Sequence, residues 1–329
     1  MNKITWGIIG CGNVTEKKSG PAFNKVPNSE LIAVMRRDAE KAADYARRHN
    51  VPKWFDDGEL LLNDPEINSV YVATPPASHI TYTLAALKKG FNVYIEKPVT
   101  LNAAEAIAIA DAAKQSTGKV SIAHYRRAQP MFLYVKELIN NGTIGDVRTV
   151  QINMWQSRKP DLITHLEDNW RINPALSGGG YFHDLSPHQL DLMLYFFGEP
   201  AYYNGRALNQ SGAFSCDDNV SGQLIFKNKV VVNGSWCFDV AQHENIDQCK
   251  IIGTTGSITF PFFGHSVTIK TETQDETIDF PALEHVQQPM IEKVVNYFNG
   301  DGPNPCAIEE AVVLMKIIDA FTAPPNPPR

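Results

Sequence analysis

A lysine that follows a short apolar run is the first candidate for chemistry in this sequence. The run Val93–Ile95 is typical of a buried strand, and Glu96, Lys97 and Pro98 come directly after it. Ligands of open α/β sheets bind outside the carboxyl ends of the strands, so Lys97 would face a cleft. Desolvation there would lower the pKa of its amine towards neutrality. The alternative is a solvated charged turn.

A second set of candidates lies on the predicted helix Tyr181–Phe197, which is apolar over much of its surface. At about 100° per residue, one stripe of this helix carries titratable side chains. The members of the stripe are Asp184, His188, Asp191 and Tyr195. Such a helix is expected to be buried with the stripe lining a cleft. The alternatives are a buried polar network that only holds the helix, or a metal site that includes His183; without HExxH or a cysteine cluster we predict no metal.

The start of this helix is open to two interpretations. Ser186 before Pro187, with Gln189 three residues after Ser186, matches an N-cap with a capping box, which would start the helix at Pro187. Asp184 would then lie in an irregular turn. The other start is close to the three glycines at 178–180, which form a flexible turn.

The elements that must position these residues change in type along the chain. The first part alternates strands and helices, which predicts an α/β Rossmann-type parallel sheet with helices on both faces. The expected strands are Ile4–Ile9, Leu31–Met35, Val70–Thr74, Val93–Ile95 and Val120–Ala123, and the expected helices are Asp38–His49, Ser78–Lys89 and Ala103–Gln115. We therefore expect a dinucleotide-binding domain over residues 1–124.

The second part, residues 125–329, is expected to be an α+β domain with a mainly antiparallel sheet. The expected strands are Val147–Trp155, Gln223–Phe226, Val230–Trp236, Lys250–Ile252, Ser257–Phe260 and Val267–Lys270, and further helices are expected at Met131–Asn140, Met290–Phe298 and Ile308–Phe321. The proline-rich end of the chain is expected to be disordered.

Composition restricts the class of protein. The chain has 329 residues, 43% hydrophobic and 20% charged, and a net charge of -6 with a pI near 5.9. This balance predicts a globular protein of two domains and argues against a nucleic-acid partner. No apolar run reaches the ~18 residues of a membrane span, and no signal-peptide pattern is seen. The five scattered cysteines indicate reduced thiols in a cytoplasmic protein.

A glycine turn directly after the first predicted strand indicates a nucleotide cofactor. Gly10 and Gly12 fit the dinucleotide fingerprint, and Asn13 and Val14 begin the segment that would present N–H groups to phosphates. The third fingerprint position is Thr15 rather than glycine or alanine, so helix and strand should pack less closely there. The alternative is a glycine turn in an α/β domain without a nucleotide.

Together these motifs resemble the signature set of the glucose-fructose oxidoreductase/inositol dehydrogenase (Gfo/Idh/MocA) family. The resemblance covers almost the whole chain, in order. It rests on Gly10-Cys11-Gly12, Thr74-Pro75-Pro76-Ala77-Ser78-His79, Glu96-Lys97-Pro98, and Gly178-Gly179-Gly180 with Asp184 and His188. Among members, the chain is similar to reductases of keto-sugars such as 1,5-anhydrofructose. The resemblance implies a Rossmann domain, a second domain with a large open sheet that often forms oligomers, and helical geometry from near the glycines.

The resemblance also implies roles for single residues. Thr74, Pro75 and His79 would lie along the cofactor, and Glu96 and Lys97 near its nicotinamide end. The alternative for His79 is local capping of a helix. His188 would be the acid/base partner of Lys97, and Asp184 would bind or orient the substrate hydroxyl; the sequence leaves open whether Lys97 or His188 transfers the proton.

The residues after the second predicted strand favour NADP(H) over NAD(H). Units that prefer NAD carry an acidic residue there, and relatives that use NAD would have it at Arg36. A guanidinium at this position can bind a 2′-phosphate, with Arg37 in support. Asp38 is the counter-argument, but it is better placed to cap the helix that follows. NAD remains the alternative cofactor.

Three further pairs are candidates for the substrate pocket. An aromatic ring and a guanidinium suit a polyhydroxylated substrate, although each pair could equally serve core packing or a surface ion pair. These pairs are Tyr125 with Arg126, Asn153 with Trp155, and Trp170 with Arg171.

We therefore predict a nicotinamide-dependent oxidoreductase that moves a hydride between NADP(H) and a carbon of a sugar, keto-sugar or polyol, with the protein handling one proton. We expect a small-molecule partner, no membrane, and a homodimer or homotetramer. One alternative is an NAD(P)-binding regulator without turnover. Another is an enzyme that oxidises a sugar transiently to eliminate or hydrolyse a bond.

Overall fold

The computed structural model of the chain describes residues 3–158, 162 and 169–323. It divides into two compact units, residues 1–129 with 283–312 and residues 130–282 with 313–329. The expected division had a single boundary after residue 124. The observed division differs from this expectation because the segment 283–312, which includes helix α9 (Gln288–Asn299), folds with the N-terminal unit. The proline-rich end from residue 324 lies outside the described residues.

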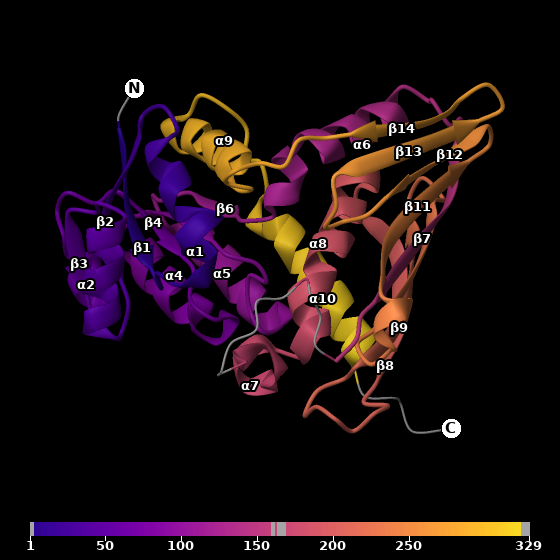
Figure 1. The fold of residues 1–329 in the computed structure, drawn as a ribbon. Helices are drawn as coiled ribbons and strands as arrows, with labels where there is room; N and C mark the ends of the chain where they lie inside the picture. Colours follow the sequence, from indigo (N-terminus) through magenta and orange to yellow (C-terminus); the bar gives the residue numbers. More distant parts are fainter. Residues whose placement is uncertain (1–2, 159–161, 163–168, 324–329) are drawn as a thin grey trace. The chain divides into compact units, whose positions relative to one another are not determined.

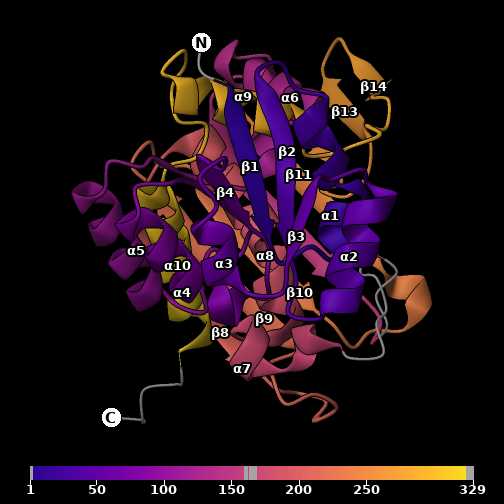
Figure 2. The ribbon, with the colours of Figure 1, turned by 90° about the vertical axis from the view of Figure 1, so that its left-hand side faces the viewer.

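The first unit is a six-stranded parallel sheet with the strand order β3-β2-β1-β4-β5-β6. Figures 1 and 2 show β1 between β2 and β4, with helices packed around the sheet. The strands are β1 (Ile4–Ile9), β2 (Ser29–Met35), β3 (Lys53–Phe55), β4 (Ser69–Val72), β5 (Asn92–Ile95) and β6 (Val120–Ile122). β1, β4 and β5 are buried along most of their length because both faces are covered. The predicted Rossmann sheet is confirmed.

The helices of this unit begin where the sequence places polar caps. The Asp38 side chain accepts a hydrogen bond from the Lys41 N–H at the start of α2. The Asn102 side chain accepts one from the Glu105 N–H at the start of α5. The α-helices are α1 (Asn13–Lys17), α2 (Ala39–Arg48), α3 (Gly58–Leu62), α4 (His79–Lys88), α5 (Ala103–Gln115) and α9 (Gln288–Asn299), and 3₁₀ turns lie at η1 (Gly20–Asn24), η2 (Pro76–Ser78) and η3 (Tyr125–Ala128).

The second unit is built on an eight-stranded sheet with the order β14-β13-β12-β11-β7-β10-β9-β8. β7 pairs in parallel with β10 and antiparallel with β11, and the other described pairs of this sheet are antiparallel. Its strands are β7 (Val147–Trp155), β8 (Pro200–Leu208), β9 (Asn219–Phe226), β10 (Val231–Cys237), β11 (Ile246–Gly253), β12 (Gly256–Phe260), β13 (Ser266–Thr271) and β14 (Asp275–Asp279). The predicted α+β domain with a large, mainly antiparallel sheet is confirmed.

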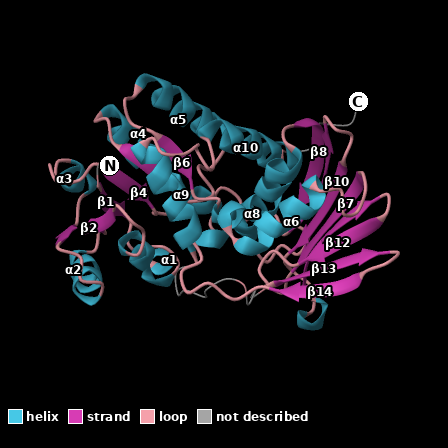
Figure 3. Cartoon of the chain, turned by 90° about the horizontal axis from the view of Figure 1, so that it is seen from above, coloured by secondary structure: helices cyan, strands magenta, loops and turns pink. Residues whose placement is uncertain are grey.

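Helices cover one face of this sheet (Figure 3). Phe132 of α6 packs on Phe260 of β12 at 5.8 Å between ring centroids, and Phe182 of α8 packs on Trp236 of β10 at 5.3 Å. The helical elements here are α6 (Pro130–Asn140), η4 (Trp170–Ile172), α7 (Pro174–Ser177), α8 (Gly180–Phe197) and η5 (Gln242–Glu244), and α10 (Ile308–Thr322) begins in the first unit and ends in the second. Successive side chains of β7 point alternately to the face that the helices cover and to the open face. Val150 and Met154 are therefore buried, whereas Gln151 is exposed.

No helix within residues 3–158 and 169–323 combines the length and apolarity that a membrane-spanning helix needs. All five cysteines are free thiols.

Candidate active site

The turn after β1 allows a ligand to approach the backbone closely. Gly10 has a φ of +96°, and a Cβ there would lie 2.6 Å from Thr74 Cγ2, so a side chain does not fit. At Gly12 an added Cβ would, apart from the neighbouring residues of the chain, meet no described atom closer than the Gly10 carbonyl oxygen at 3.9 Å. The first glycine makes the tight turn and the second leaves room beside the chain, as a dinucleotide requires.

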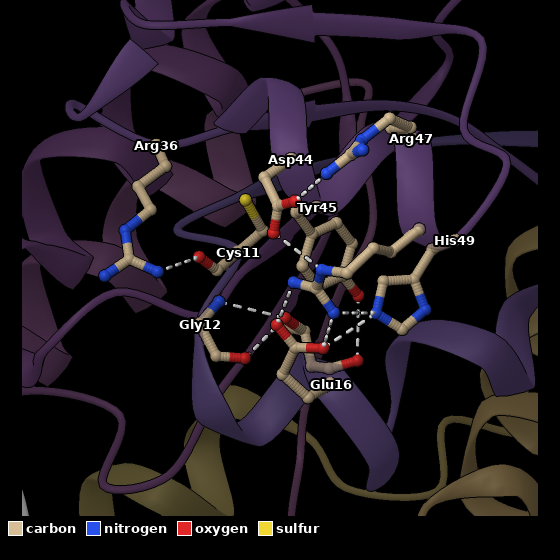
Figure 4. A network of polar contacts seen from close by, with 10 residues as sticks. Cys11, Gly12, Glu16, Arg36, Asp44, Tyr45, Arg47 and His49 are labelled. Atoms are coloured by element: carbon tan, nitrogen blue, oxygen red, sulfur yellow. Dashed lines mark hydrogen bonds and ion pairs between the residues drawn. The ribbon is translucent and has the colours of Figure 1, made fainter. Parts of the chain in front are cut away.

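Thr15, at the third fingerprint position, holds this turn through two hydrogen bonds. Its hydroxyl accepts a hydrogen bond from the Gly12 N–H at 2.9 Å and donates to the Gly12 carbonyl oxygen at 2.8 Å. The Tyr45 hydroxyl of α2 donates to the Thr15 carbonyl oxygen at 2.8 Å. α1 has only five residues, so the turn depends on these contacts more than on a helix dipole. Figure 4 shows the turn beside α2.

An ion-pair network joins α1 to the end of α2 behind the turn (Figure 4). The Glu16 carboxylate accepts two hydrogen bonds of 2.7 Å from the Arg48 guanidinium and lies 2.8 Å from His49 Nε2. Hydrogen bonding by Arg48 lowers the pKa of Glu16 to about 2. The carboxylate therefore stays ionised, and the network keeps α1 in place beneath the glycines.

Arg36, the predicted reader of the cofactor, lies beside the same turn. Its Nη1 donates to the Cys11 carbonyl oxygen at 3.3 Å (Figure 4). Asp38 accepts from the Lys41 N–H at 3.1 Å and pairs with Lys41 Nζ at 3.1 Å, which confirms its expected role as a helix cap. The arginine therefore lies at the glycine turn while the aspartate is engaged by α2. Arg37 is exposed.

The loops after β4 and β5 meet around a buried histidine. His79 Nε2 lies 2.7 Å from the Thr74 carbonyl oxygen, and Nδ1 lies 3.1 Å from the Pro98 carbonyl oxygen. Burial lowers the pKa of His79, so the ring is neutral near pH 7 and donates from one nitrogen. His79 therefore lies between the loop that carries Thr74 and Pro75 and the loop that carries Lys97, and its neutral ring donates a hydrogen bond to only one of the two loops.

Lys97 is half-buried at the carboxyl end of β5, and its peptide bond to Pro98 is cis. Glu96 is 5% exposed, and its carboxylate accepts hydrogen bonds from the Lys97 N–H, the Tyr71 hydroxyl and the Gln287 amide. Tyr71 and Gln287 were not found from the sequence. A single tyrosine in an apolar strand and a single glutamine before a helix carry no local signal of this contact.

In the second unit, α8 begins at Gly180 and runs through Pro187, so the later helix start allowed by the capping-box pattern is wrong. Three members of its polar stripe are buried, namely Asp184 (8% exposed), His188 (4%) and Asp191 (3%), whereas Tyr195 is half-buried. Arg171 Nε donates to Asp184 Oδ2 at 2.9 Å, and its guanidinium lies 4.7 Å from the Trp170 ring centroid. The structure thus brings together three predicted site residues: Trp170, Arg171 and Asp184.

His183, on the same helix, has its pKa lowered to about 4 by burial, so it is neutral near pH 7. Its ring packs against the glycine turn, because a Cβ at Gly179 would lie 2.2 Å from it. Within the described ranges, no group of three histidine, cysteine or acidic side chains is arranged to hold a metal ion.

Asn153 and Trp155 lie on the open face of the eight-stranded sheet. Their neighbour Met154 pairs with Trp236, whose indole donates to Gln189 of α8 at 3.0 Å, so Met154 faces the helices. Because side chains alternate along a strand, Asn153 and Trp155 face away from α8. This face does not bring them to Asp184 or His188. The sequence carries no signal of which side of the sheet α8 covers.

Tyr125 and Arg126 lie in η3 of the first unit and are buried, with the guanidinium 5.5 Å from the tyrosine ring centroid. They follow β6, at the carboxyl edge of the sheet that also carries the glycine turn and Lys97. This placement is compatible with a pocket at that edge.

Comparison with known proteins gives a consistent result. Residues 4–124 match the oxidoreductase family with an NAD-binding Rossmann fold, and residues 132–259 match the GFO/IDH/MocA C-terminal domain. The chain is 47% identical to "Oxidoreductase P35" of Formosa agariphila over 320 residues, 97% of this chain and 98% of that protein. It is 27% identical to the 1,5-anhydro-D-fructose reductase of Ensifer adhaerens over 262 residues, 78% of this chain and 75% of that protein.

Among solved structures, levoglucosan dehydrogenase in complex with NADH and levoglucosan superposes with a TM-score of 0.84 and 22% identity, covering 97% of this chain and 96% of that one. The glycine turn, the Rossmann sheet and the eight-stranded sheet agree with these matches. The chain therefore belongs to the Gfo/Idh/MocA family and is an NAD(P)-dependent oxidoreductase.

Proposed function

We propose that this oxidoreductase transfers a hydride between NADP(H) and a CH–OH or carbonyl carbon of a sugar, keto-sugar or polyol. The observation that carries the proposal is that the open turn at Gly12 and the half-buried Lys97 follow β1 and β5, which are separated only by β4 in the parallel sheet. A cofactor on the turn and a proton-transfer group are thereby held at one edge. The names of the two sugar-related relatives support the substrate class.

The chain's residues fit a nicotinamide dinucleotide. Gly12 leaves open space beside the backbone, and Arg36 offers N–H donors for a 2′-phosphate. Thr74 and Pro75 lie in the loop that follows β4. When bound, the nicotinamide supplies or accepts the hydride. The protein has to orient the substrate and hold or remove one proton at the reacting oxygen.

Lys97 and His188 are the two candidates for that proton. An amine or imidazole positioned at the reacting oxygen contributes roughly 10²–10⁴-fold in rate. Asp184, held by Arg171 at 2.9 Å, would accept a hydrogen bond from a substrate hydroxyl and so orient the carbon that exchanges hydride. Trp170 beside Arg171 offers an apolar face to a sugar ring.

We also propose a homodimer or homotetramer that buries the open face of the eight-stranded sheet, on which Asn153 and Trp155 lie. Free thiols at all five cysteines support a reducing compartment, the cytoplasm. Sedimentation of wild type and of Trp155→Glu tests the assembly, because a charge on a buried face should dissociate it. A wild-type monomer would contradict this proposal.

A screen of sugars, keto-sugars and polyols with both cofactors tests the reaction. We expect absorbance change at the reduced-nicotinamide band with at least one substrate and a preference for NADP(H). Conversion of a sugar without net change of the cofactor would replace the proposal with redox-assisted elimination or hydrolysis. Cofactor binding without conversion of any compound would instead favour a regulator.

A further inference from the structure

We propose that Gln287 is a positioning residue for Lys97 and acts through the buried carboxylate of Glu96. The inference rests on the proposed role of Lys97 in proton transfer. Gln287 lies 191 positions after Glu96 in the sequence and is completely buried directly before α9. It reaches Glu96 because the segment 283–312 folds with the first unit.

The contacts around Glu96 fix the orientation of the amide. Gln287 Nε2 lies 2.5 Å from Glu96 Oε1, and Gln287 Oε1 accepts from the Tyr94 hydroxyl at 3.4 Å. The amide thus presents its donor nitrogen to the carboxyl group and its acceptor oxygen to the tyrosine hydroxyl. The Tyr71 hydroxyl donates to the same carboxylate oxygen.

The other oxygen of Glu96 holds the backbone of the next residue. Glu96 Oε2 accepts from the Lys97 N–H at 3.0 Å. The carboxylate is therefore fixed on one side by Tyr71 and Gln287 and on the other side holds the peptide that carries Lys97. Without the amide donor, the buried carboxyl group of Glu96 would lose one of the hydrogen bonds that hold it and would reorient.

The same segment also contacts the end of the helix that follows the glycine turn. The Gln287 backbone N–H donates to the Lys18 carbonyl oxygen at 3.1 Å, and His285 Nδ1 donates to the Lys17 carbonyl oxygen at 2.7 Å. Both carbonyls lie at the end of α1, the helix that follows Gly12. The main chain of Gln287 thus contacts the end of α1 while its side chain holds Glu96, so this residue links the helix after the glycine turn to the segment that carries Lys97.

Two substitutions separate positioning from folding. Gln287→Met keeps the length of the side chain but removes the donor, and kcat should fall about tenfold or more while Kd for NADPH stays within about twofold. Displacement of a catalytic group by about 1 Å can cost about 100-fold in rate. Gln156→Met is the matched control, because Gln156 is 3% exposed and donates to a carbonyl in the second unit, far in sequence from Lys97.

Gln287→Glu places a second carboxyl group against Glu96. At acidic pH the pair shares one proton, which restores a donor, whereas at alkaline pH two negative charges repel. The ratio of wild-type to variant kcat should therefore grow as the pH rises. A ratio that is constant with pH, measured on folded protein, would show that the amide acts only in packing and would overturn the proposal.

A readout without substrate separates this inference from the proposed function. The rate of acylation of the Lys97 amine, followed by peptide mass spectrometry, should change in Gln287→Met, because Glu96 no longer fixes the peptide that carries Lys97, and should be unchanged in Gln156→Met. If wild type turned over no compound, the proposed function would fail and the labelling rate would decide the inference. Equal labelling of Lys97 in wild type and a folded Gln287→Met protein would refute it. If Gln287→Met did not fold, the rate of Lys97 acylation in Gln287→Glu, divided by the wild-type rate at each of two pH values, would decide the inference instead.

Discussion

Replacing Arg36 should change the choice of cofactor. Its guanidinium lies beside the glycine turn, where Nη1 donates to the Cys11 carbonyl oxygen at 3.3 Å. It carries further N–H groups that can bind a phosphate in a fork geometry. An adenosine ribose at this turn would place its 2′-phosphate within reach of the guanidinium, and wild type should then bind NADPH more tightly than NADH.

The size of the effect follows from the hydrogen bond. A bond to a charged group contributes about 1.5–3 kcal/mol, and each 1.4 kcal/mol changes a dissociation constant about tenfold. Arg36 is only half-buried, so screening by water favours the lower part of this range. Arg36→Gln should therefore weaken NADPH binding about tenfold and leave NADH binding within about twofold. Arg36→Asp should reverse the preference, because its carboxylate repels the phosphate and accepts from ribose hydroxyls.

Titration of each protein with NADPH and NADH, followed by cofactor fluorescence, measures a dissociation constant for every pair of protein and cofactor. Arg47→Gln is the matched control: it removes the same charge from α2, where Arg47 is exposed and paired with Asp44. An equal loss of NADPH affinity in this control would show that Arg36 acts only through the overall charge of the protein. Wild type that bound NADH as tightly as NADPH, or an Arg36→Asp protein with unchanged preference, would refute the role of Arg36.

Three further results are expected. Lys97→Ala should lower kcat roughly 10²–10⁴-fold with little change in cofactor Kd; a variant with more than half of the wild-type kcat would contradict this. Asp184→Ala and His188→Ala should each lose activity yet stay folded by circular dichroism, whereas variants that melt far lower and recover activity when stabilised would show a purely structural role. Because burial lowers the pKa of His183 from 6.5 to about 4, the unfolded chain binds more protons between these values, so stability should fall as the pH drops from 6.5 to 4. The melting temperature of His183→Phe should fall less than that of wild type over this pH interval. An unchanged dependence of the melting temperature on pH would exclude His183 as the cause of the fall.

Much of the fold could be predicted because local patterns agree with the tertiary structure. β1 and β7 have the predicted bounds, as does α5, since apolar runs, alternation and caps all mark them. β3, β8 and β14 were missed. They lie at sheet edges, where strands are short or carry polar and charged residues, so their sequences lack the apolar signal of central strands.

The site was predictable where a motif is local and not where it depends on packing. The glycine turn, the position of Arg36 and the helical stripe follow from residues close in sequence. The contact of Gln287 with Glu96 crosses most of the chain, and the outward orientation of Trp155 depends on which face of the sheet α8 covers. The sequence showed that Asn153 and Trp155 share one side of a strand, but it carried no signal of which side packs against helices.

The discontinuity of the first unit has a consequence for biosynthesis. A ribosome completes residues 1–129 before the roughly 150 residues of the intervening segment, and at about 5–20 residues per second this takes roughly 8–30 s. During that interval Glu96 is without the Gln287 amide, and the end of α1 is without His285. The nascent cofactor-binding unit therefore reaches its final form only after the strands of the other unit have been translated. A fragment cut at residue 129 would remain in this immature state, whereas one fused through a short linker to residues 283–312 would carry the segment that completes it.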